Sequence, residues 1–424
     1  MTLKLLRKNG IFLSAALFIG LAGCGGAGGP GTTTTGSGGA GPSGGSGGAG
    51  PGGGSGGAGP SGSGGSTSNG SGGSDVDASS GGSGGITGTD GAAGATEAGT
   101  GSGGTIVPVG TKGVQADPGT EGDGTIDDPP PYPPAPETVA RKAGVPVGKV
   151  MPYQIYASTN VYKSQGLKFN YTIYVPAQYQ KGKPAAFMLF LDGQHFAGPG
   201  PGPTIPTPVP AEDYHWNAPV LYDNLIASGE LPVTIVAFMD PGVPNGMYRR
   251  GDNFHPDAEL RSMEYDKASP DFGNFLINEF IPDCVKKDYD IVDDPDGWGI
   301  GGHSSGGIAA ITTPWFHIDK FHKAHSSSAS YPNTNNFPGT PSFPNAFNSV
   351  TPAKPIRITM LSGTMDLGGW FAANTSAANI LKAKGYHYRF RPGQDNHVPP
   401  MAAINEFANA MRWLWRGYSL PWYK

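Results

Sequence analysis

From about residue 145 to the C-terminus, short apolar runs alternate with segments of helical periodicity. Apolar runs rich in β-branched and aromatic side chains are typical of buried strands, and we expect such strands at 169–175, 186–191, 233–238, 298–301, 324–329, 356–361 and 386–391. We expect helices between them at 219–228, 272–281, 305–316, 372–384 and 402–415. This alternation predicts one α/β domain with a mostly parallel central sheet and helices on both faces.

One predicted strand breaks directly into a predicted helix at a serine. Residues 297–307 read Gly-Trp-Gly-Ile-Gly-Gly-His-Ser-Ser-Gly-Gly. In a Gly-x-Ser-x-Gly elbow the serine backbone is strained, and the flanking glycines avoid the clash that a Cβ would make across the turn. The same pattern around Ser46, Ser55 and Ser83 lacks a preceding strand and a following apolar helix, so we interpret those matches as accidents of composition. Ser304 is therefore the predicted nucleophile, with a plain strand-to-helix turn as the alternative.

A serine nucleophile needs a histidine as base and a carboxylate that orients the histidine. Asp366 follows one predicted strand and His397 follows the last one, so both lie at carboxyl ends of strands, where reactive groups of such sheets belong. Their order after Ser304, acid before histidine, is that of α/β-hydrolases. Asp395 is the alternative acid, although it is only two residues from His397 and would have difficulty reaching Nδ1. We interpret His303, beside the nucleophile, as packing.

The oxyanion of an acyl-transfer reaction needs two preorganised backbone donors. The amide of Ser305 comes directly after the nucleophile and is the first candidate. The turn Leu191-Asp192-Gly193-Gln194 follows a predicted strand and offers the amide of Gln194 as the second. The alternative is that this turn only ends the strand.

Four motifs occur in a characteristic order. They are Val175-Pro176-Ala177-Gln178-Tyr179, then Phe190-Leu191-Asp192-Gly193-Gln194, then Arg261 with Glu264 ahead of Glu279-Phe280-Ile281-Pro282, and the Ser304 elbow followed by Gly306-Gly307. Together they resemble the enterochelin-esterase and esterase-D-like group of α/β-hydrolases over about residues 145–420. The resemblance implies the α/β-hydrolase fold and a Ser-His-Asp triad.

The resemblance does not name a substrate, because the group includes siderophore, feruloyl and acetyl-xylan esterases, S-formylglutathione hydrolases and mycolyltransferases. Siderophore esterases often have glycine before the catalytic histidine and an aromatic residue after it. Asn396 and Val398 flank His397 here, which weakens the siderophore interpretation.

Four further side chains are candidates for contact with substrate. Trp216 lies near the end of a long insertion at 197–217, and Trp370 closely follows the predicted acid. The insertion with Trp216 would form a wall of the cleft, and Trp370 would offer an aromatic face to a sugar or a phenolic group; core packing is the alternative for both. Arg261 and Glu264 form either a structural ion pair or part of the substrate site.

The first 24 residues predict an export signal. A basic start is followed by an apolar stretch at 11–21 that is too short to span a bilayer comfortably. Leu21-Ala22-Gly23-Cys24 resembles a bacterial lipobox, which implies cleavage before Cys24 and lipid on that cysteine. An ordinary signal peptide or an uncleaved anchor is the alternative. Gly25 follows the cysteine, which in some diderm bacteria permits export to the outer membrane, so we expect a lipid-anchored protein outside the cytoplasm.

Residues 25–104 are rich in Gly and Ser and contain no Lys or Arg. Such a composition buries too little apolar surface to offset chain entropy, so we expect a disordered tether. Residues 105–144 are rich in Pro and Asp, and we expect a stiffer linker there. The catalytic domain is then expected at 145–424.

Charge and motifs exclude several classes of partner. The net charge is −5 and no long basic run occurs, so nucleic acid is not expected as a partner. Nothing resembles a phosphate loop, a dinucleotide fingerprint or a metal-ligand cluster, so we expect no cofactor and no metal.

The sequence thus predicts a serine carboxylic-ester hydrolase that works outside the cytoplasm through an acyl-enzyme. The expected substrate is a small-molecule or glycan-linked ester. One alternative is an acyltransferase that uses the same triad. Another is a surface binding module that has the fold without turnover.

Overall fold

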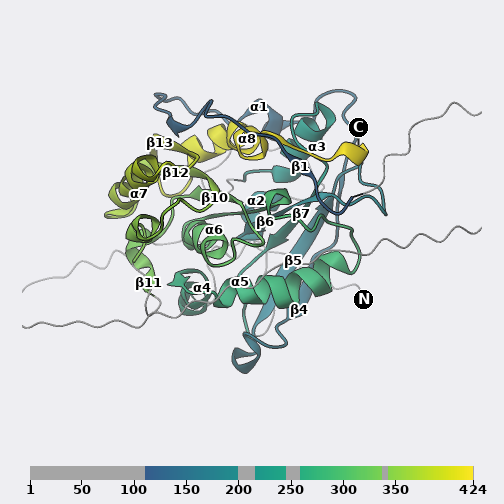
Figure 1. Cartoon of the computed structure of the whole chain (residues 1–424), viewed down its shortest axis with the longest axis horizontal. Coiled ribbons are helices and arrows are strands. Elements are labelled where there is room, and N and C mark those ends of the chain that lie inside the picture. Colours follow the sequence, from purple (N-terminus) through teal and green to yellow (C-terminus); the bar gives the residue numbers. More distant parts are fainter. Residues whose placement is uncertain (1–109, 199–214, 245–257, 337–341, 424) are drawn as a thin grey trace, which may run out of the picture. The chain divides into compact units, whose positions relative to one another are not determined.

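The computed structural model describes residues 110–198, 215–244, 258–336 and 342–423. Its main sheet contains β2 (Gly124–Thr125), β3 (Lys149–Val150), β4 (Gln154–Ala157), β5 (Lys168–Val175), β6 (Ala186–Leu191), β7 (Thr234–Met239), β9 (Trp298–His303), β10 (Lys323–Ser327), β12 (Arg357–Met365) and β13 (Tyr388–Asn396). Their order is β2-β13-β12-β10-β9-β6-β7-β5-β3, with β4 paired to β5 (Figure 1). Neighbouring strands from β2 to β7 run parallel, and β5 pairs antiparallel with β3, β4 and β7.

The helices are α1 (Pro136–Val139), α2 (Gly193–Ala197), α3 (Ala218–Ala227), α4 (Ala258–Tyr265), α5 (Asp271–Phe275), the π-helix η3 (Leu276–Lys286), α6 (Ser305–Phe316), α7 (Trp370–Lys384) and α8 (Met401–Trp415). Short 3₁₀ turns lie at Lys163–Gln165, Pro295–Gly297, Tyr331–Asn333, Asn345–Ser349 and Pro421–Tyr423. Two small ladders join β1 (Val114–Gln115) to β14 (Tyr418–Ser419), and β8 (Lys267–Ala268) to β11 (Asn335–Asn336).

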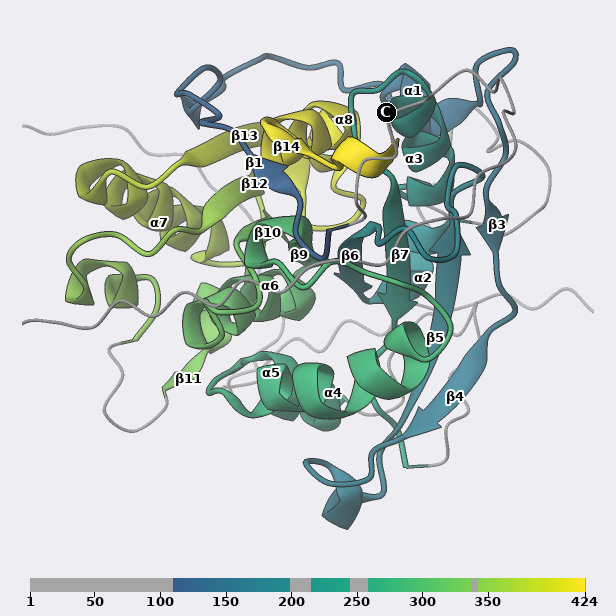
Figure 2. The same ribbon diagram turned by 45° about the vertical axis from the view of Figure 1, so that its right-hand side comes forward.

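Helices cover both faces of the main sheet. The ring of His325 in β10 lies 5.3 Å from that of Phe407 in α8, whereas its neighbour Ala324 packs in one cluster with Ile308 of α6. Successive residues of a strand point to opposite faces, so α6 and α8 lie on opposite sides. Figures 1 and 2 show α3 with α8 on one side, and α4 and α5 with α6 on the other.

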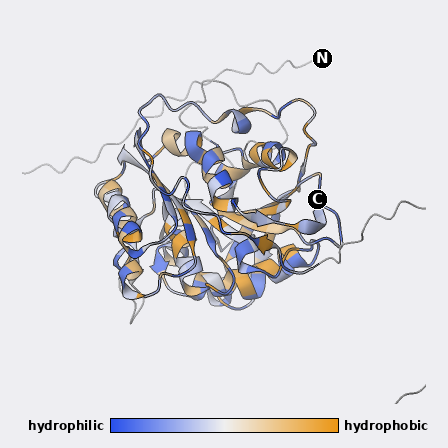
Figure 3. Ribbon diagram, turned by 45° about the horizontal axis from the view of Figure 1, so that its top comes forward, coloured by the Kyte–Doolittle hydropathy of each residue, from blue (hydrophilic) through white to orange (hydrophobic). Residues whose placement is uncertain are grey.

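The core lies along the middle strands. Every residue of β6, β7 and β9 is buried, which is the pattern of parallel strands covered on both faces. In Figure 3 the surrounding helices carry both hydrophobic and hydrophilic colours, as amphipathic helices do. The mostly parallel α/β-hydrolase sheet expected from the sequence is confirmed.

Each expected strand and helix lies on an element of the structure, but several bounds differ. β12 and β13 continue to Met365 and Asn396, beyond the apolar runs that predicted them, because backbone pairing persists through residues such as Gly363 and Gly393. The helix expected at 272–281 begins as α5 and continues as the π-helix η3 to Lys286.

Residues 110–144, which we assigned to a linker, contribute to this domain. β1 pairs with β14, β2 pairs with β13, and Asn224 of α3 donates to the carbonyls of Glu137 and Ala140 at 2.9 Å. Folded structure therefore begins before the boundary that we placed at residue 145. This segment binds the domain largely through single side chains and carbonyls. Such contacts leave no periodic pattern in the sequence, so the sequence did not predict them.

The expected signal at 1–24, with Cys24, and the expected tether at 25–104 lie outside the described residues. In the part of the chain that the structure describes, no helix has the length and apolar character needed to cross a membrane.

Candidate active site

Ser304 lies between the end of β9 and the start of α6. Its backbone has φ 62° and ψ −124°, a conformation that residues with a side chain rarely adopt. A Cβ on Gly302 would lie 2.3 Å from the carbonyl oxygen of Gly306, and one on Gly306 would lie 2.6 Å from Asp192 Oδ2. The two flanking glycines are therefore required by the close approach of the chain, as an elbow demands.

The structure brings Ser304, His397 and Asp366 together. His397 Nε2 lies 3.1 Å from Ser304 Oγ, and His397 Nδ1 lies 2.7 Å from Asp366 Oδ1. Both distances are those of hydrogen bonds, and the ring uses one nitrogen for each partner. This geometry allows the imidazole to take a proton from the serine while the carboxylate orients it.

The register of the sheet brings acid and histidine together. β12 and β13 pair in parallel until Met365 lies opposite Asn396, so the next residues, Asp366 and His397, leave the sheet side by side. Neither their separation of 31 positions nor the composition of their loops indicates this pairing.

Asp366 is held as a carboxylate. Its Oδ1 also accepts from the Leu367 amide at 2.8 Å, and its Oδ2 accepts from Ser362 Oγ at 3.0 Å. Burial alone would raise the pKa of Asp366, but the hydrogen bond and charge of His397 together with the Leu367 amide hold it below its usual value. Asp395, the alternative acid, accepts from the Ala402 amide at 2.6 Å instead.

Two buried rings pack on His397. The ring of Trp370 meets it edge-on with centroids 5.0 Å apart, and the ring of His303 lies at 4.7 Å. His303 Nδ1 in turn contacts Ser327 Oγ at 3.0 Å. Burial and the neighbouring His397 lower the pKa of His303 well below its usual value, so this ring stays neutral beside the imidazole that must carry a proton.

The two expected oxyanion donors differ in their surroundings. The Ser305 amide lies in the first turn of α6, where amides have no acceptor within the helix, so it is suited to an anion. The Gln194 amide donates to Asp240 Oδ1 at 3.0 Å. It becomes available to an oxyanion only when that hydrogen bond is broken. Asp240 directly follows the apolar strand β7, and this position at a carboxyl end of the sheet is the signal that would have indicated it.

Arg261 and Glu264 do not form the ion pair that the sequence suggested. Arg261 donates to both oxygens of Asp192, at 2.9 and 2.7 Å, and to the carbonyl of His303 at 3.3 Å. It thereby joins the turn after β6 to the end of β9. Both oxygens of Glu264 accept from the Gly242 amide at 3.1 Å.

Burial affects the ionisation of Arg261 and of Glu264 differently. Burial opposes ionisation of Arg261, but the adjacent Asp192 carboxylate more than compensates and raises the pKa of the arginine. Burial raises the pKa of Glu264 well above its usual value despite the Gly242 amide. Because one side chain serves the turn and the other a backbone amide, both are explained without a substrate.

The two candidate tryptophans are also engaged with the protein. Trp216 is fully buried and stacks on Phe196 with centroids 4.5 Å apart. Trp370 is 5% exposed and packs on His397. Both rings are therefore buried against other side chains of the protein, as the packing alternative expects.

Among the described residues, no group of three His, Cys, Asp or Glu side chains is placed to bind a metal ion. Cys284 is buried, and burial raises the pKa of its thiol to about 12, so it is a poor nucleophile at neutral pH.

Two solved structures of low sequence identity are similar to part of this chain. The enterobactin esterase of Shigella flexneri, solved in the presence of 2,3-dihydroxy-N-benzoyl-serine, is 18% identical, with a TM-score of 0.48 over 67% of this chain. The match spans 63% of the length of that enzyme. A CE1 ferulic acid esterase of the anaerobic fungus Anaeromyces mucronatus is 17% identical, with a TM-score of 0.45 over 66% of this chain and 96% of its own. A search of curated proteins finds no match.

Family models give a clearer result. The model of the Esterase family, described as "Putative esterase", matches residues 163–413. The matched range is more than half of the chain, and it contains the elbow, the acid and the histidine. We conclude that the chain belongs to the Esterase family.

Proposed function

We propose that this protein is a serine esterase that hydrolyses carboxylic esters through an acyl-enzyme. The observation that carries the proposal is the continuous chain of hydrogen bonds from Ser304 through His397 to Asp366. A partly buried cluster with this order of groups is the arrangement that activates a serine hydroxyl. Membership of the Esterase family supports the same reaction.

In the proposed reaction Ser304 Oγ attacks the ester carbonyl and His397 Nε2 takes its proton. The tetrahedral intermediate then collapses, and His397 returns the proton to the leaving alcohol. Water, deprotonated by the same nitrogen, hydrolyses the acyl-enzyme and restores Ser304. Asp366, already ionised, stabilises the imidazolium that forms in each half-reaction.

The oxyanion is proposed to rest on the Ser305 amide and, once released from Asp240, on the Gln194 amide. The Asp240 carboxylate at the Gln194 amide would repel an oxyanion at that donor. Substrate must therefore displace Asp240 from the Gln194 amide. The first donor needs no such change, because it lies at the start of α6.

The proposed substrate is a small-molecule or glycan-linked ester. The proposed location is outside the cytoplasm, with lipid on Cys24 as anchor and residues 25–104 as tether, because the N-terminal sequence resembles a lipoprotein signal. The low-identity structures do not decide among substrates.

The test uses the full chain in mild detergent with p-nitrophenyl acetate and a fluorophosphonate probe. We expect hydrolysis and labelling in the wild type, and loss of both in Ser304→Ala. Ser228→Ala, at the exposed end of α3, is the control and keeps both. Absence of labelling in the wild type, or labelling that persists in Ser304→Ala, contradicts the proposal.

Two alternatives use the same site and are separated by product analysis. An acyltransferase would show transfer to an added alcohol in excess of hydrolysis. A binding module would bind ester ligands equally well in the wild type and in Ser304→Ala, with no turnover in either.

A further inference from the structure

The segment before residue 135 runs along the open edge of β13. β2 pairs in parallel with Arg389 and Phe390, and the Ile126 amide donates to the Phe390 carbonyl at 2.8 Å. Beyond this point β12 is the only strand paired with β13 among the described residues, and residues 127–134 contact β13 through the side chains of Asp128 and Tyr132. We call residues 124–134 the strap.

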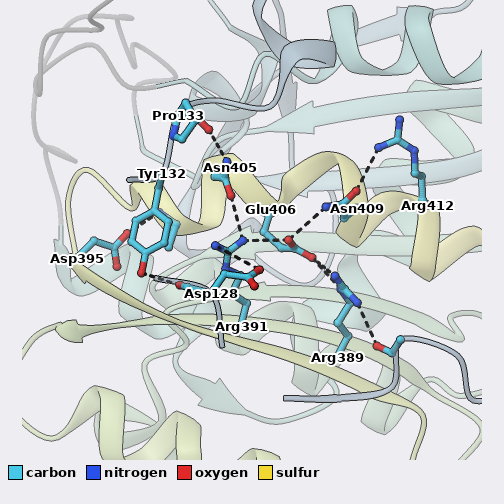
Figure 4. A network of polar contacts seen from close by, with 12 residues as sticks. Asp128, Tyr132, Pro133, Arg389, Arg391, Asp395, Asn405, Glu406, Asn409 and Arg412 are labelled. Atoms are coloured by element: carbon cyan, nitrogen blue, oxygen red, sulfur yellow. Dashed lines mark hydrogen bonds and ion pairs between the residues drawn. The ribbon is translucent and has the colours of Figure 1, made fainter. Parts of the chain in front are cut away.

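Tyr132 is the contact of the strap that lies farthest along β13. Its hydroxyl accepts from the Gln394 amide at 3.0 Å and donates to the Asp128 carbonyl at 3.2 Å. Its ring covers the guanidinium of Arg391 at 5.1 Å from the centroid. Tyr132 is 8% exposed, and its hydrogen bond with the Gln394 amide is partly buried. Figure 4 shows this tyrosine between Asp395 and the Arg391 side chain.

The strap also binds the helix that follows the catalytic histidine. The Pro133 carbonyl accepts from Asn405 Nδ2 at 2.5 Å, and Asn405 Oδ1 accepts from Arg391 Nη1 at 3.0 Å (Figure 4). Arg391 further pairs with the buried Glu406 of α8 at 3.1 Å. Strand β13, helix α8 and the strap therefore form one polar network, whose centre, Arg391 with Glu406, is buried.

His397 lies on the short connection between β13 and α8. Gln394 is three residues before it, and Asp395 closes the connection by accepting from the Ala402 amide at 2.6 Å. Without the Tyr132 hydroxyl the Gln394 amide would lose its acceptor two residues before β13 ends at Asn396. A catalytic base must stay close to its working position. A mutation far from the reacting atoms that displaces it by about 1 Å can lower the rate by about 10²-fold.

We propose that the strap positions the catalytic histidine, with Tyr132 as the positioning residue. This inference rests on the proposed function, because it assigns His397 as the base. It also makes the proline-rich segment a part of the catalytic unit. Its prolines restrict the backbone, so a carbonyl and a tyrosine ring are presented with little loss of chain entropy.

The test compares Tyr132→Phe with Tyr423→Phe in the full chain. Each variant loses one hydroxyl with a bonded partner, since Tyr423 donates to the Lys183 carbonyl at 2.6 Å. We expect Tyr132→Phe to lower kcat by about threefold to tenfold, the worth of one neutral hydrogen bond, with KM unchanged. Tyr423→Phe is expected to keep both constants, with a similar change in Tm. Wild-type kcat in Tyr132→Phe, or an equal fall in both variants, overturns the inference.

Hydrogen exchange separates this inference from the proposed function. We expect the amides of residues 394–398 to exchange faster in Tyr132→Phe and Tyr132→Ala than in the wild type and in Tyr423→Phe. Unchanged exchange overturns the role of the strap whatever the activity. A wild-type chain that neither hydrolyses esters nor reacts with fluorophosphonate overturns the proposed function instead.

Discussion

Replacement of Arg261 by methionine tests how the turn after β6 is held beside the elbow. The Asp192 side chain is 3% exposed and receives two hydrogen bonds from an arginine whose side chain is 13% exposed. Arg261→Met removes the guanidinium and both of these hydrogen bonds from the buried carboxylate. Removal of one partner of a buried ion pair costs about 3 to 5 kcal/mol, so we expect the free energy of unfolding at pH 7 to fall by that amount.

The double variant Asp192→Asn, Arg261→Met separates the pair itself from the charge left behind. A neutral side chain at 192 carries no uncompensated charge, so most of the lost stability is expected to return. Arg412→Met is the control. Arg412 also contacts two carboxylates, Glu137 and Glu230, but its side chain is 28% exposed, so we expect a loss within about 1 kcal/mol.

The assay is urea unfolding, with the slope compared among variants so that a change of midpoint reports stability. Two results would refute the reasoning. One is a loss below about 1 kcal/mol in Arg261→Met, which would mean that water or another group compensates Asp192. The other is a double variant that is no more stable than the single one.

Three further predictions follow from the charges in the structure. Asp366→Asn is expected to lower kcat by about 10⁴-fold with little change in KM, because an amide does not hold the productive tautomer of His397; a fall below about tenfold contradicts this. Burial raises the pKa of Glu264 well above 4.5, so the folded state binds its proton more tightly and loses stability as pH rises above 4.5. The stability of Glu264→Gln relative to the wild type should therefore increase as pH rises from 4.5 in urea unfolding, and a constant difference would count against it. Burial lowers the pKa of Lys323 from 10.5 to about 7, so between these values the unfolded state binds more protons and stability rises with pH. The stability of Lys323→Met relative to the wild type should therefore be largest at or below pH 7 and shrink toward pH 10, and a difference that does not change with pH would contradict this.

Local patterns predicted the strands and helices well. A strand that is buried on both faces is an apolar run, and such a run can be recognised without knowing which other elements pack against it. The helix that follows Ser304 was expected at 305–316 and lies there. The pairing of side chains was predicted less well. Arg261 and Glu264 are three residues apart in one helix, yet their partners, Asp192 and Gly242, come from other parts of the chain.

The same limit explains the tryptophans and the strap. Trp216 and Trp370 were expected toward substrate because aromatic residues near a site have that role in many enzymes. Whether such a ring is covered depends on Phe196 and His397, which lie elsewhere in the sequence. Tyr132 lies in a proline-rich stretch, and its contact with the Gln394 amide bridges 262 positions.

The sequence by itself determined the elbow, because glycines on both sides of Ser304 and an apolar strand and helix around it are local requirements of one turn. It also determined the class of sheet and the order of acid and histidine. Only the tertiary structure decided which groups meet. The register of β12 against β13 places Asp366 beside His397. The parallel pairing of β6 with β7 places Asp240 at the Gln194 amide. Distances between strands are set by packing of the whole domain, and no short stretch of residues contains that information.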